Sequence, residues 1–418
     1  MSEKCLKRMG IQVQESNSEM VSLIKDRVYG RLDMSQDLED SELMDVIDEC
    51  VLEESRITMI PIRQRQELAE TVFNAIRRLD VLQDILEDDS ITEIMINGKD
   101  NIFIERNGRI EKSGKVFDSD ARLEDIAQKI AALSNRIVNA SVPIVDTRLA
   151  DGSRVCIILP PVALNGPIIT VRKFFEIPLT IEKLIELGSV NTEVAAFLEK
   201  AVKAKYNLFI SGGTGSGKTT FLNVLSNFIP KDERIVTIED SAELQLKKVE
   251  NIVRLEARNA NVEGKNAITI RDLIKASLRL RPDRIIVGEV RGEETLDMIQ
   301  AMSTGHDGSL STGHGNSPED MMARLETMVL MGMDMPVSAV RQQIASAIDI
   351  IVHLGRLRDK SRRVLKIVEI TGIENGEIAF NTLYEFKETG EEGGKVQGGL
   401  VRVAQNLKNT EKMQRAGY

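Results

Sequence analysis

The spacing of apolar residues changes several times along the chain and predicts where helices and strands lie. Residues 1–34 have no firm periodicity, which predicts a flexible N-terminus. Residues 37–56 and 63–80 place apolar residues at helical period between acidic and basic faces. Residues 35–89 are therefore expected to form a helical region.

Short runs of alternating apolar and polar residues follow, with glycine-containing turn signals between them. The predicted strands are 91–97, 101–106, 144–149, 154–159 and 168–174. A helix after the second strand is expected to begin at Asp118 or Ser119, whose side chains suit an N-cap. These elements predict a small α/β domain over residues 90–175, followed by a linker at 176–178.

From Thr180 on, helices alternate with apolar strands at the spacing of βαβ units. The predicted strands are 207–210, 235–238, 252–255 and 285–287. Residues 179–388 are therefore predicted to form a parallel sheet with helices packed on it. Residues 389–418 begin with a stretch rich in glycine and charge, which predicts a flexible tail.

A glycine-rich loop follows the first strand of this second domain. Its residues are Gly212, Gly213, Thr214, Gly215, Ser216, Gly217, Lys218, Thr219 and Thr220. Backbone N–H groups in such a loop surround phosphate oxygens, Lys218 adds a positive charge, and the Thr219 hydroxyl is placed to ligate Mg²⁺. A glycine-rich turn without a ligand is the alternative. Because the lysine, the hydroxyl and both flanking elements are present, the loop predicts binding of a nucleoside triphosphate.

Two carboxylates follow strands of the same domain and predict hydrolysis. Glu289 follows the strand 285–287, where an NTPase needs an acid near Mg²⁺, but Gly288 stands where the usual motif has aspartate. Glu239 is the candidate base that polarises water, with Glu289 holding Mg²⁺ through water, and the two roles could be exchanged. The alternatives are a plain polar strand end for Glu289 and a capping role for Asp240 and Glu243.

Two of the three histidines lie in the glycine-rich segment 304–316. His306 and His314 have no third nitrogen or sulfur ligand nearby, so a zinc site is disfavoured. We expect both to sense the γ-phosphate, and the alternative for His306 is that it caps a turn. His353 lies in an apolar run and is expected in the core or at its rim.

Arginines in the first α/β domain are candidates for completing the site. Arg148 and Arg154 flank a turn, and Arg172 closes the strand before the linker. Charged residues at a domain edge are usually solvated. Charge on a transferring γ-phosphate, however, is well stabilised by guanidinium groups from outside the phosphate loop. Further candidates in the second domain are Arg254, Arg279, Arg281 and Arg291.

The composition of the chain limits the classes of partner that it is expected to bind. Lys and Arg number 55 and Asp and Glu number 65, which gives a formal net charge of −10. Such a charge repels nucleic acid and anionic lipid unless a basic patch is concentrated locally. Residues 1–18 have no apolar signal segment, no run approaches ~18 consecutive apolar residues, and the 3 cysteines form no CxxC pair. A reducing, cytoplasmic setting is expected.

The motifs in this order resemble the secretion ATPases of type II, type IV pilus and type IV secretion systems. They are the phosphate loop, an aspartate box at 237–244, an atypical Walker B at 288–289 and a histidine box at 305–316. The helical region, the segment 146–155 and the segment 304–309 are most similar to the CpaF-like ATPases of tight adherence (Flp) pili. The tetracysteine zinc insert of type II secretion ATPases has no counterpart in the sequence, which counts against that branch.

The resemblance implies a homohexameric ring. It also implies a RecA-like ATPase domain at 179–388, a PAS-like domain at 90–175, and ATP held between them. Arg148, Arg154 and Arg172 stand where the family brings arginines to the nucleotide. No shared motif covers the residues before 90 or after 386.

We therefore expect a Mg²⁺-dependent ATPase, peripheral at the inner face of the cell membrane, that pushes on an inner-membrane platform protein and so assembles or exports a pilus-like polymer. A nucleic-acid translocase on the same core is one alternative. A translocase of this kind needs aromatic side chains on which bases stack. The chain has no Trp and only 4% aromatic residues, so nucleic acid is not expected as a partner. A nucleotide-gated scaffold without turnover is the other alternative, and Gly288 permits it.

Overall fold

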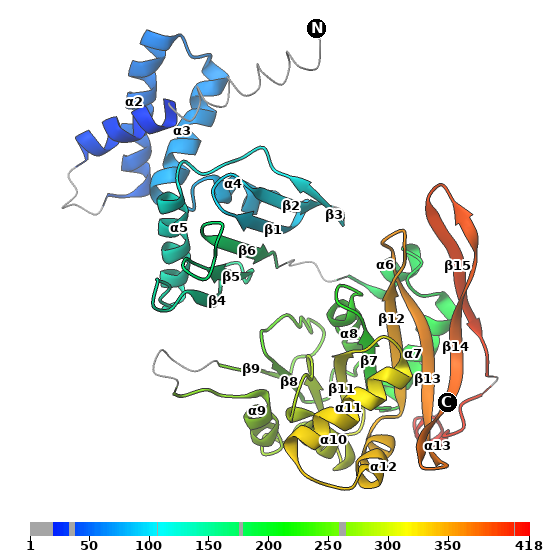
Figure 1. Ribbon diagram of the computed structural model, residues 1–418. Coiled ribbons are helices and arrows are strands. Elements are labelled where there is room, and N and C mark those ends of the chain that lie inside the picture. The colour runs from blue at the N-terminus through cyan, green and yellow to red at the C-terminus, as the bar shows by residue number, and fades with distance from the viewer. Residues whose placement is uncertain (1–19, 33–37, 107, 175–178, 259–264, 405) are drawn as a thin grey trace. The chain divides into compact units, whose positions relative to one another are not determined.

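The computed structural model describes residues 20–32, 38–106, 108–174, 179–258, 265–404 and 406–418. The predicted linker at 176–178 lies outside these residues. The chain forms two compact units, Met1–Phe175 and Glu176–Tyr418, each with its own buried core (Figure 1). The mixed α/β class predicted from the sequence is confirmed.

A small helical bundle opens the first unit. Residues 20–31 form one helix, and α2 (Asp40–Thr58) and α3 (Ile62–Arg77) follow. The expectation of a flexible N-terminus is wrong for residues 20–31. Ile24 and Val28 lie one helical turn apart, and both are fully buried in a core that they share with α2 and α3.

A six-stranded antiparallel sheet forms the rest of the first unit, in the order β3-β2-β1-β6-β5-β4. The strands are β1 Ile91–Asn97, β2 Ile102–Arg106, β3 Arg109–Lys112, β4 Ile144–Arg148, β5 Arg154–Ile158 and β6 Ile168–Arg172. The helices are α4 Val81–Glu87 and α5 Asp120–Leu133. Ser119, one of the two predicted N-caps, caps helix α5, and the buried residues of this helix lie in the same core as the inward-facing residues of the sheet.

The second unit is built on a nine-stranded sheet in the order β15-β14-β13-β12-β7-β11-β10-β8-β9. The strands are β7 Leu208–Gly212, β8 Ile235–Glu239, β9 Ile252–Glu256, β10 Arg284–Val287, β11 Leu310–His314, β12 Ile350–Arg356, β13 Arg362–Glu374, β14 Glu377–Glu392 and β15 Lys395–Arg402. Strands β12 to β9 of this order run parallel, whereas β13, β14 and β15 are antiparallel. The carboxyl ends of the parallel strands therefore meet at one edge, the carboxyl edge, and their beginnings meet at the opposite amino edge.

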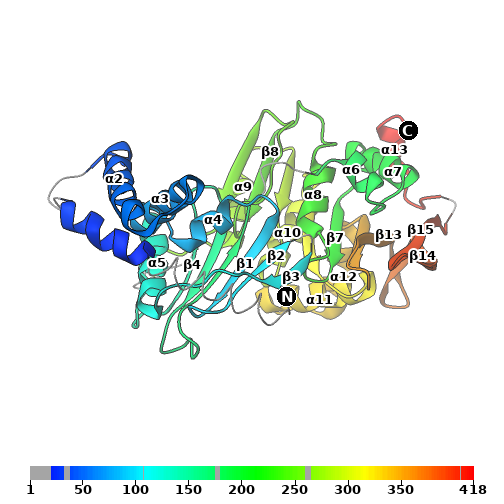
Figure 2. The same ribbon diagram turned by 90° about the horizontal axis from the view of Figure 1, so that it is seen from above.

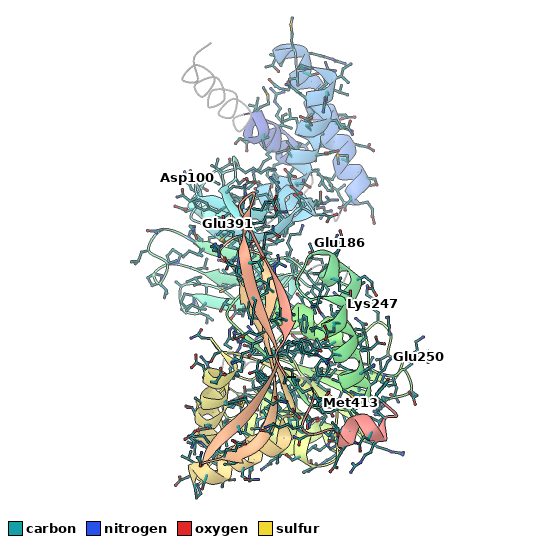
Figure 3. The ribbon with its side chains drawn as sticks, turned by 90° about the vertical axis from the view of Figure 1, so that its right-hand side faces the viewer. Asp100, Glu186, Lys247, Glu250, Glu391 and Met413 are labelled. Atoms are coloured by element: carbon teal, nitrogen blue, oxygen red, sulfur yellow. The ribbon has the colours of Figure 1, made fainter. Side chains whose placement is uncertain are left out.

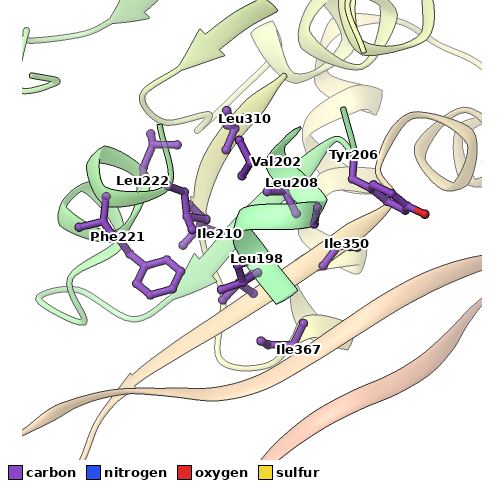
Figure 4. Packing of buried hydrophobic residues seen from close by; sticks show 14 of the residues in the cluster. Leu198, Val202, Tyr206, Leu208, Ile210, Phe221, Leu222, Leu310, Ile350 and Ile367 are labelled. Atoms are coloured by element: carbon purple, nitrogen blue, oxygen red, sulfur yellow. The ribbon is translucent and has the colours of Figure 1, made fainter. Parts of the chain in front are cut away.

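Helices cover both faces of this sheet. They are α6 Ile181–Glu186, α7 Thr192–Lys203, α8 Lys218–Ser226, α9 Ile270–Ser277, α10 Glu294–Ser303, α11 Pro318–Gly332 and α12 Val337–Ala347. Figure 2 shows α6–α8 and α10–α12 on opposite faces. Leu208 and Ile210 of β7 pack with α7 and α8 (Figure 4), whereas Phe209 belongs to the core with α9–α12. Burial on both faces explains why this strand is apolar at successive positions.

The prediction of a flexible tail at 389–418 is wrong. Strands β14 and β15 form a long hairpin at the edge of the sheet, and Figure 3 shows it with Glu391 near its tip. Gly393 and Gly394 form the turn with φ values of 57° and 73°, which two-residue hairpin turns require. The glycine-rich composition therefore marks a turn.

The chain beyond this hairpin is held at the amino edge. Glu369 is buried, and its carboxylate accepts the N–H groups of Lys408 (2.8 Å) and Asn409 (2.6 Å). The short helix α13 (Glu411–Arg415) follows and carries Met413, which is labelled in Figure 3. Lys412 of this helix pairs with Asp349 at 2.7 Å, directly before β12.

Asn207 connects four segments at the amino edge. Its buried side-chain amide donates to the carbonyl groups of Met302 (3.2 Å) and Ala347 (2.7 Å). Its side-chain oxygen accepts the N–H groups of Gly308 (2.8 Å) and Ser309 (3.0 Å). One residue before β7 thus fixes the ends of α10 and α12 and the start of β11.

Arg284 makes a second buried polar contact at this edge. It is fully buried at the start of β10 and donates from Nε and Nη2 to the carboxylate of Glu233, at 2.5 and 2.9 Å. Its Nη1 also donates to the carbonyl groups of Val202 (2.7 Å) and Gly308 (3.2 Å). These bonds satisfy a charge pair that burial would otherwise make costly.

We expect Arg284→Met to lower the free energy of unfolding by about 3–5 kcal/mol, because the buried charge of Glu233 would keep only the more distant Lys205, at 3.8 Å. Arg358 pairs with Glu388 at 2.7 Å on the surface and offers a matched control. Arg358→Met should cost less than about 1 kcal/mol. Urea unfolding followed by circular dichroism measures both, and equal losses would contradict the role given to Arg284.

Candidate functional site

The glycine-rich loop joins β7 to α8 at the carboxyl edge. Gly212 ends β7, and any side chain there would overlap the carbonyl oxygen of Leu354 and lie 2.6 Å from the Ser216 hydroxyl. Gly217 has a φ of 94°, which favours glycine, and α8 begins at the next residue. Lys218 Nζ donates to the carbonyl of Gly213 at 3.1 Å, so the lysine closes over the loop.

Glu239 ends β8 at the same edge and is only 3% exposed. One carboxylate oxygen accepts the N–H groups of Glu243 (2.8 Å) and Leu244 (2.9 Å), which fix its direction. Burial raises the pKa of Glu239 above its ordinary value, against the opposing effect of these two bonds. A buried carboxylate that is oriented and made more basic suits a general base.

Glu239 also explains why Gly288 stands where the usual motif has aspartate. A Cβ on Gly288 would lie 3.0 Å from Cγ of Glu239, which is tighter than nine in ten real contacts of this kind, so Glu239 would have to shift. An aspartate at 288 would therefore compete with Glu239 for the same space. In this protein Glu239 of β8 supplies the carboxylate at this point of the site, and the residue after β10, Gly288, has no side chain.

Glu289 is the second carboxylate of the carboxyl edge, and two side chains hold it. Its Oε1 lies 2.7 Å from Nε2 of His314 at the end of β11. Its Oε2 accepts from Nε (3.1 Å) and Nη2 (2.8 Å) of Arg291. Arg291 also lies 3.7 Å from Asp240. The carboxylate thus sits between an imidazole and a guanidinium.

His314 links this carboxylate to the phosphate loop. Its Nδ1 lies 3.3 Å from Nζ of Lys218. An ammonium group only donates, so Nδ1 is the acceptor, and the proton of the neutral ring is then on Nε2, the nitrogen that lies 2.7 Å from Glu289. Burial lowers the pKa of His314, against the opposing effect of Glu289. The neutral tautomer with its proton on Nε2 accounts for both contacts.

A cavity of about 470 Å³ opens beside these groups. It is lined by Gly213, Thr214, Arg291, His314, Gly315, Asn316, Asp320 and Arg324. Loop backbone on one side and guanidinium groups on the other fit a polyphosphate. The buried Ser216 hydroxyl, which has no hydrogen-bond partner among the residues that the structure describes, fits a loop that is completed by a ligand. Thr219, the first residue after Lys218 in α8, and Glu289 are the residues here that would hold Mg²⁺.

Sequence reasoning missed several residues of the site. Arg324 and Asp320 reach the cavity from α11, although nothing in their local pattern distinguishes them from ordinary helix-surface residues. Arg362 donates to the carbonyl of Gly215 at 2.9 Å from the start of β13. Strand β13 runs antiparallel to β12, so it begins where β12 ends, at the carboxyl edge. Only this long-range pairing brings Arg362 to the loop.

His306 does not join the site, and its expected role beside His314 is wrong for this unit. It lies before β11, at the amino edge, whereas His314 ends that strand. Its Nδ1 lies 3.1 Å from the carbonyl of Ala301, and its own carbonyl accepts from the hydroxyl of Ser309 (2.7 Å). These contacts fit the alternative role of His306 in a turn. His353 is buried, as predicted, and its Nδ1 lies 2.9 Å from the Ser211 hydroxyl.

The other arginine candidates of the second unit lie at different places, some at the site and some away from it. Arg291 belongs to the site, as described above. Arg254 in β9 donates to the carbonyl of Leu244 at 3.0 Å, next to the segment that holds Glu239. Arg279 and Arg281 lie between α9 and the start of β10, which places them at the amino edge, away from the phosphate loop.

The three arginine candidates of the first unit form a row across its sheet. Arg148 of β4 pairs in register with Arg154 of β5, and Arg154 pairs with Arg172 of β6. Glu93 of β1 continues the row and lies 3.4 Å from Arg172. Directly opposed like charges destabilise a sheet. Three arginines nevertheless lie side by side on adjacent strands of this sheet.

Comparisons with known proteins place these motifs in a family. The chain matches the family model described as Type II/IV secretion system protein over residues 77–416. A putative conjugal transfer protein of Mycobacterium tuberculosis is 34% identical over 301 residues, which cover 70% of this chain and 85% of that protein. The type IV secretion system protein VirB11 of Brucella abortus is 30% identical over 303 residues, 66% of this chain and 84% of that protein.

Solved structures agree on the fold. The ATPase DotB of Legionella pneumophila has a TM-score of 0.50 at 21% identity, over 70% of this chain and 79% of that one. The pilus retraction motor PilT with bound ADP has a TM-score of 0.50 at 17% identity, over 81% of this chain and 87% of that one. These likenesses support the RecA-like core expected from the sequence. By the extent of the family match, the chain belongs to the type II/IV secretion system protein family.

Proposed function

We propose that this chain hydrolyses ATP with Mg²⁺ as cofactor. The observation that carries the proposal is the meeting of the phosphate loop, Glu239, Glu289 and His314 at one edge of a parallel sheet. Open α/β sheets bind ligands at this edge. A nucleotide-gated scaffold without turnover is the alternative. It would not require a carboxylate that is buried, oriented and made more basic, as Glu239 is.

In this proposal, different residues of the site bind the phosphates, hold Mg²⁺ and activate water. The loop backbone from Gly213 to Thr220 and the Lys218 ammonium bind the phosphates. Thr219, and Glu289 through water, hold Mg²⁺, which when bound neutralises phosphate charge. Glu239 accepts a proton from the attacking water. If the two acids exchange roles, Glu289 is the base and Glu239 orients the magnesium shell.

The arginine row completes the site in this proposal. Arg148, Arg154 and Arg172 approach the γ-phosphate from the first unit, either of the same chain or of a neighbouring one. Support comes from their register across three adjacent strands, which concentrates positive charge on one sheet. Guanidinium groups from outside the loop stabilise charge that develops on the transferring phosphate.

The wider role that we propose is that of a hexameric motor at the cytoplasmic face of the cell membrane. It pushes on an inner-membrane platform protein and so assembles or exports a pilus-like polymer, as the CpaF-like ATPases of tight adherence (Flp) pili do. The family match and the order of the motifs support this role. A net charge of −10 and the lack of Trp favour protein cargo over nucleic acid, although some relatives are named for conjugal transfer.

Glu239→Gln should reduce ATP hydrolysis by ~10²-fold or more and leave ATP binding intact, because the carboxylate acts on water. Lys218→Ala should lose triphosphate binding itself. Asp240→Asn is the matched control, since Asp240 follows Glu239 directly but its side chain is 55% exposed. Phosphate release and binding of a fluorescent ATP analogue measure the two steps. A parental rate in Glu239→Gln would move the role of base to Glu289.

His314→Gln should lower hydrolysis by about tenfold or more with ATP still bound, because the imidazole connects Lys218 to Glu289. His306→Gln should leave hydrolysis by the full chain within about twofold, because His306 lies at the amino edge. The same two assays measure both variants. Equal losses of hydrolysis would contradict the separation of the two histidines.

Mixing two inactive variants tests whether the arginine row of one chain acts at the phosphate loop of another. A Lys218→Ala chain and an Arg148→Ala/Arg154→Ala chain should each be inactive, and an arginine finger is worth about 10³–10⁵ in rate. Mixed rings should recover part of the activity, because some interfaces pair an intact loop with intact arginines. Hydrolysis by the parental chain should rise steeply with protein concentration through the assembly range. Mixed rings that form but stay inactive would limit the arginines to their own chain or exclude them.

A further inference from the structure

The turn between α2 and α3 exposes large apolar side chains. Ile57, Met59 and Ile62 are 69%, 88% and 81% exposed. The other residues of the bundle that point inward at helical spacing are buried in its core. Scattered exposed apolar residues are ordinary, but three within six positions of one turn form a patch. We call residues 57–62 the apolar tip.

The apolar tip lies at the end of the bundle away from the sheet of the first unit (Figure 1). Helix α3 has 16 residues, which span about 24 Å. Its C-terminal end is fixed near the sheet, where Lys129 of α5 donates to the carbonyl groups of Arg77 (2.7 Å) and Arg78 (2.9 Å). Its N-terminal end carries the tip, which therefore projects from this unit.

The backbone conformation of Met59 is energetically unfavourable for a methionine. Met59 ends α2 in the left-handed region, with a φ of 52°. Glycine and asparagine are favoured at this position of a helix, and a larger residue costs roughly 1–2 kcal/mol. Because its side chain is also the most exposed of the tip, Met59 gains little from packing in its own unit. Packing among the described residues of its own unit therefore does not account for a methionine at this position.

The charges nearest the tip are mostly positive. Residues 55–66 contain Arg56, Arg63 and Arg65, and the acidic residues Glu53, Glu54 and Glu67 flank this stretch. Arg65 Nε donates to the carbonyl of Ile60 at 2.8 Å and so holds the turn. Arg56 and Arg63 are exposed, and Arg63 lies 3.6 Å from Glu67 in an ion pair whose side chains are 94% and 66% exposed. So exposed a pair contributes little, and Arg63 can exchange it for a phosphate group. The apolar tip therefore has a basic collar.

We propose that the apolar tip inserts into the surface of an anionic lipid bilayer, with Arg56 and Arg63 on the phosphate groups. Aliphatic side chains at the acyl boundary and cations at the headgroups are what a bilayer surface selects. A convex turn without aromatic residues is a poor match for the aromatic-rich hot spots of protein interfaces. In the described part of the chain, no helix is long and apolar enough to cross a membrane. The inference deepens the proposed function, because it names a membrane contact for the motor.

Sedimentation of the full chain with protein-free vesicles tests the proposal. Vesicles of phosphatidylcholine with roughly one third phosphatidylglycerol should bind the parental protein, and pure phosphatidylcholine should bind it much less. Ile57→Ser/Met59→Ser/Ile62→Ser should weaken binding by about tenfold or more. Arg56→Gln and Arg63→Gln should each weaken it about fivefold at low salt, and less in about 0.5 M salt. Leu164→Ser is the control, because Leu164 is 91% exposed elsewhere in the unit.

A fluorescent reporter gives a second readout, since the chain has no Trp. Met59→Trp should shift its emission to the blue on anionic vesicles and be quenched by brominated lipid, whereas Leu164→Trp should do neither. Unchanged emission, or equal sedimentation of the triple serine variant, would overturn the proposal. Binding only to vesicles that contain membrane proteins would overturn it in favour of a protein partner. ATP hydrolysis in solution is measured on the same preparations, so a protein that hydrolyses ATP but ignores vesicles refutes this inference alone.

Discussion

The register between β7 and β11 is the constraint on which the site depends. Asn207, before β7, accepts the N–H groups of Gly308 and Ser309, before β11, and so fixes the two strands at the amino edge. Both strands then run in parallel to the carboxyl edge, where Gly212 stands opposite His314. A slip of one residue would send every side chain of β11 to the other face. The contact between His314 and Lys218 is therefore set by a buried amide at the far end of both strands.

This arrangement explains which parts of the site were visible in the sequence. The phosphate loop has its own local signature, and Glu239 and Glu289 follow buried strands whose apolar runs identify them. His306 was misplaced because the strand Leu310–His314 was not predicted. Five residues of strand span about 16 Å, so the two histidines cannot reach one phosphate from the same unit.

Other features depend on contacts between distant segments, which a single sequence does not display. Gly288 is explained only when β8 and β10 lie side by side and Glu239 fills the space beside it. Arg362 reaches the loop only because β13 pairs with β12. The glycine-rich tail was predicted to be flexible because its composition fits a linker and a hairpin turn equally well. Pairing with β14 decides between them.

The charges of the cavity suggest why guanidinium groups from outside the loop would matter. Arg291 lines the cavity, but both of its contacting nitrogens donate to Glu289. It cannot serve phosphate with those nitrogens unless it releases the acid that we assign to Mg²⁺. Arg362 is similarly engaged with the loop carbonyl of Gly215 through Nε. These two guanidinium groups thus hold an acid and the loop of their own unit, whereas Arg324 lines the same cavity from α11.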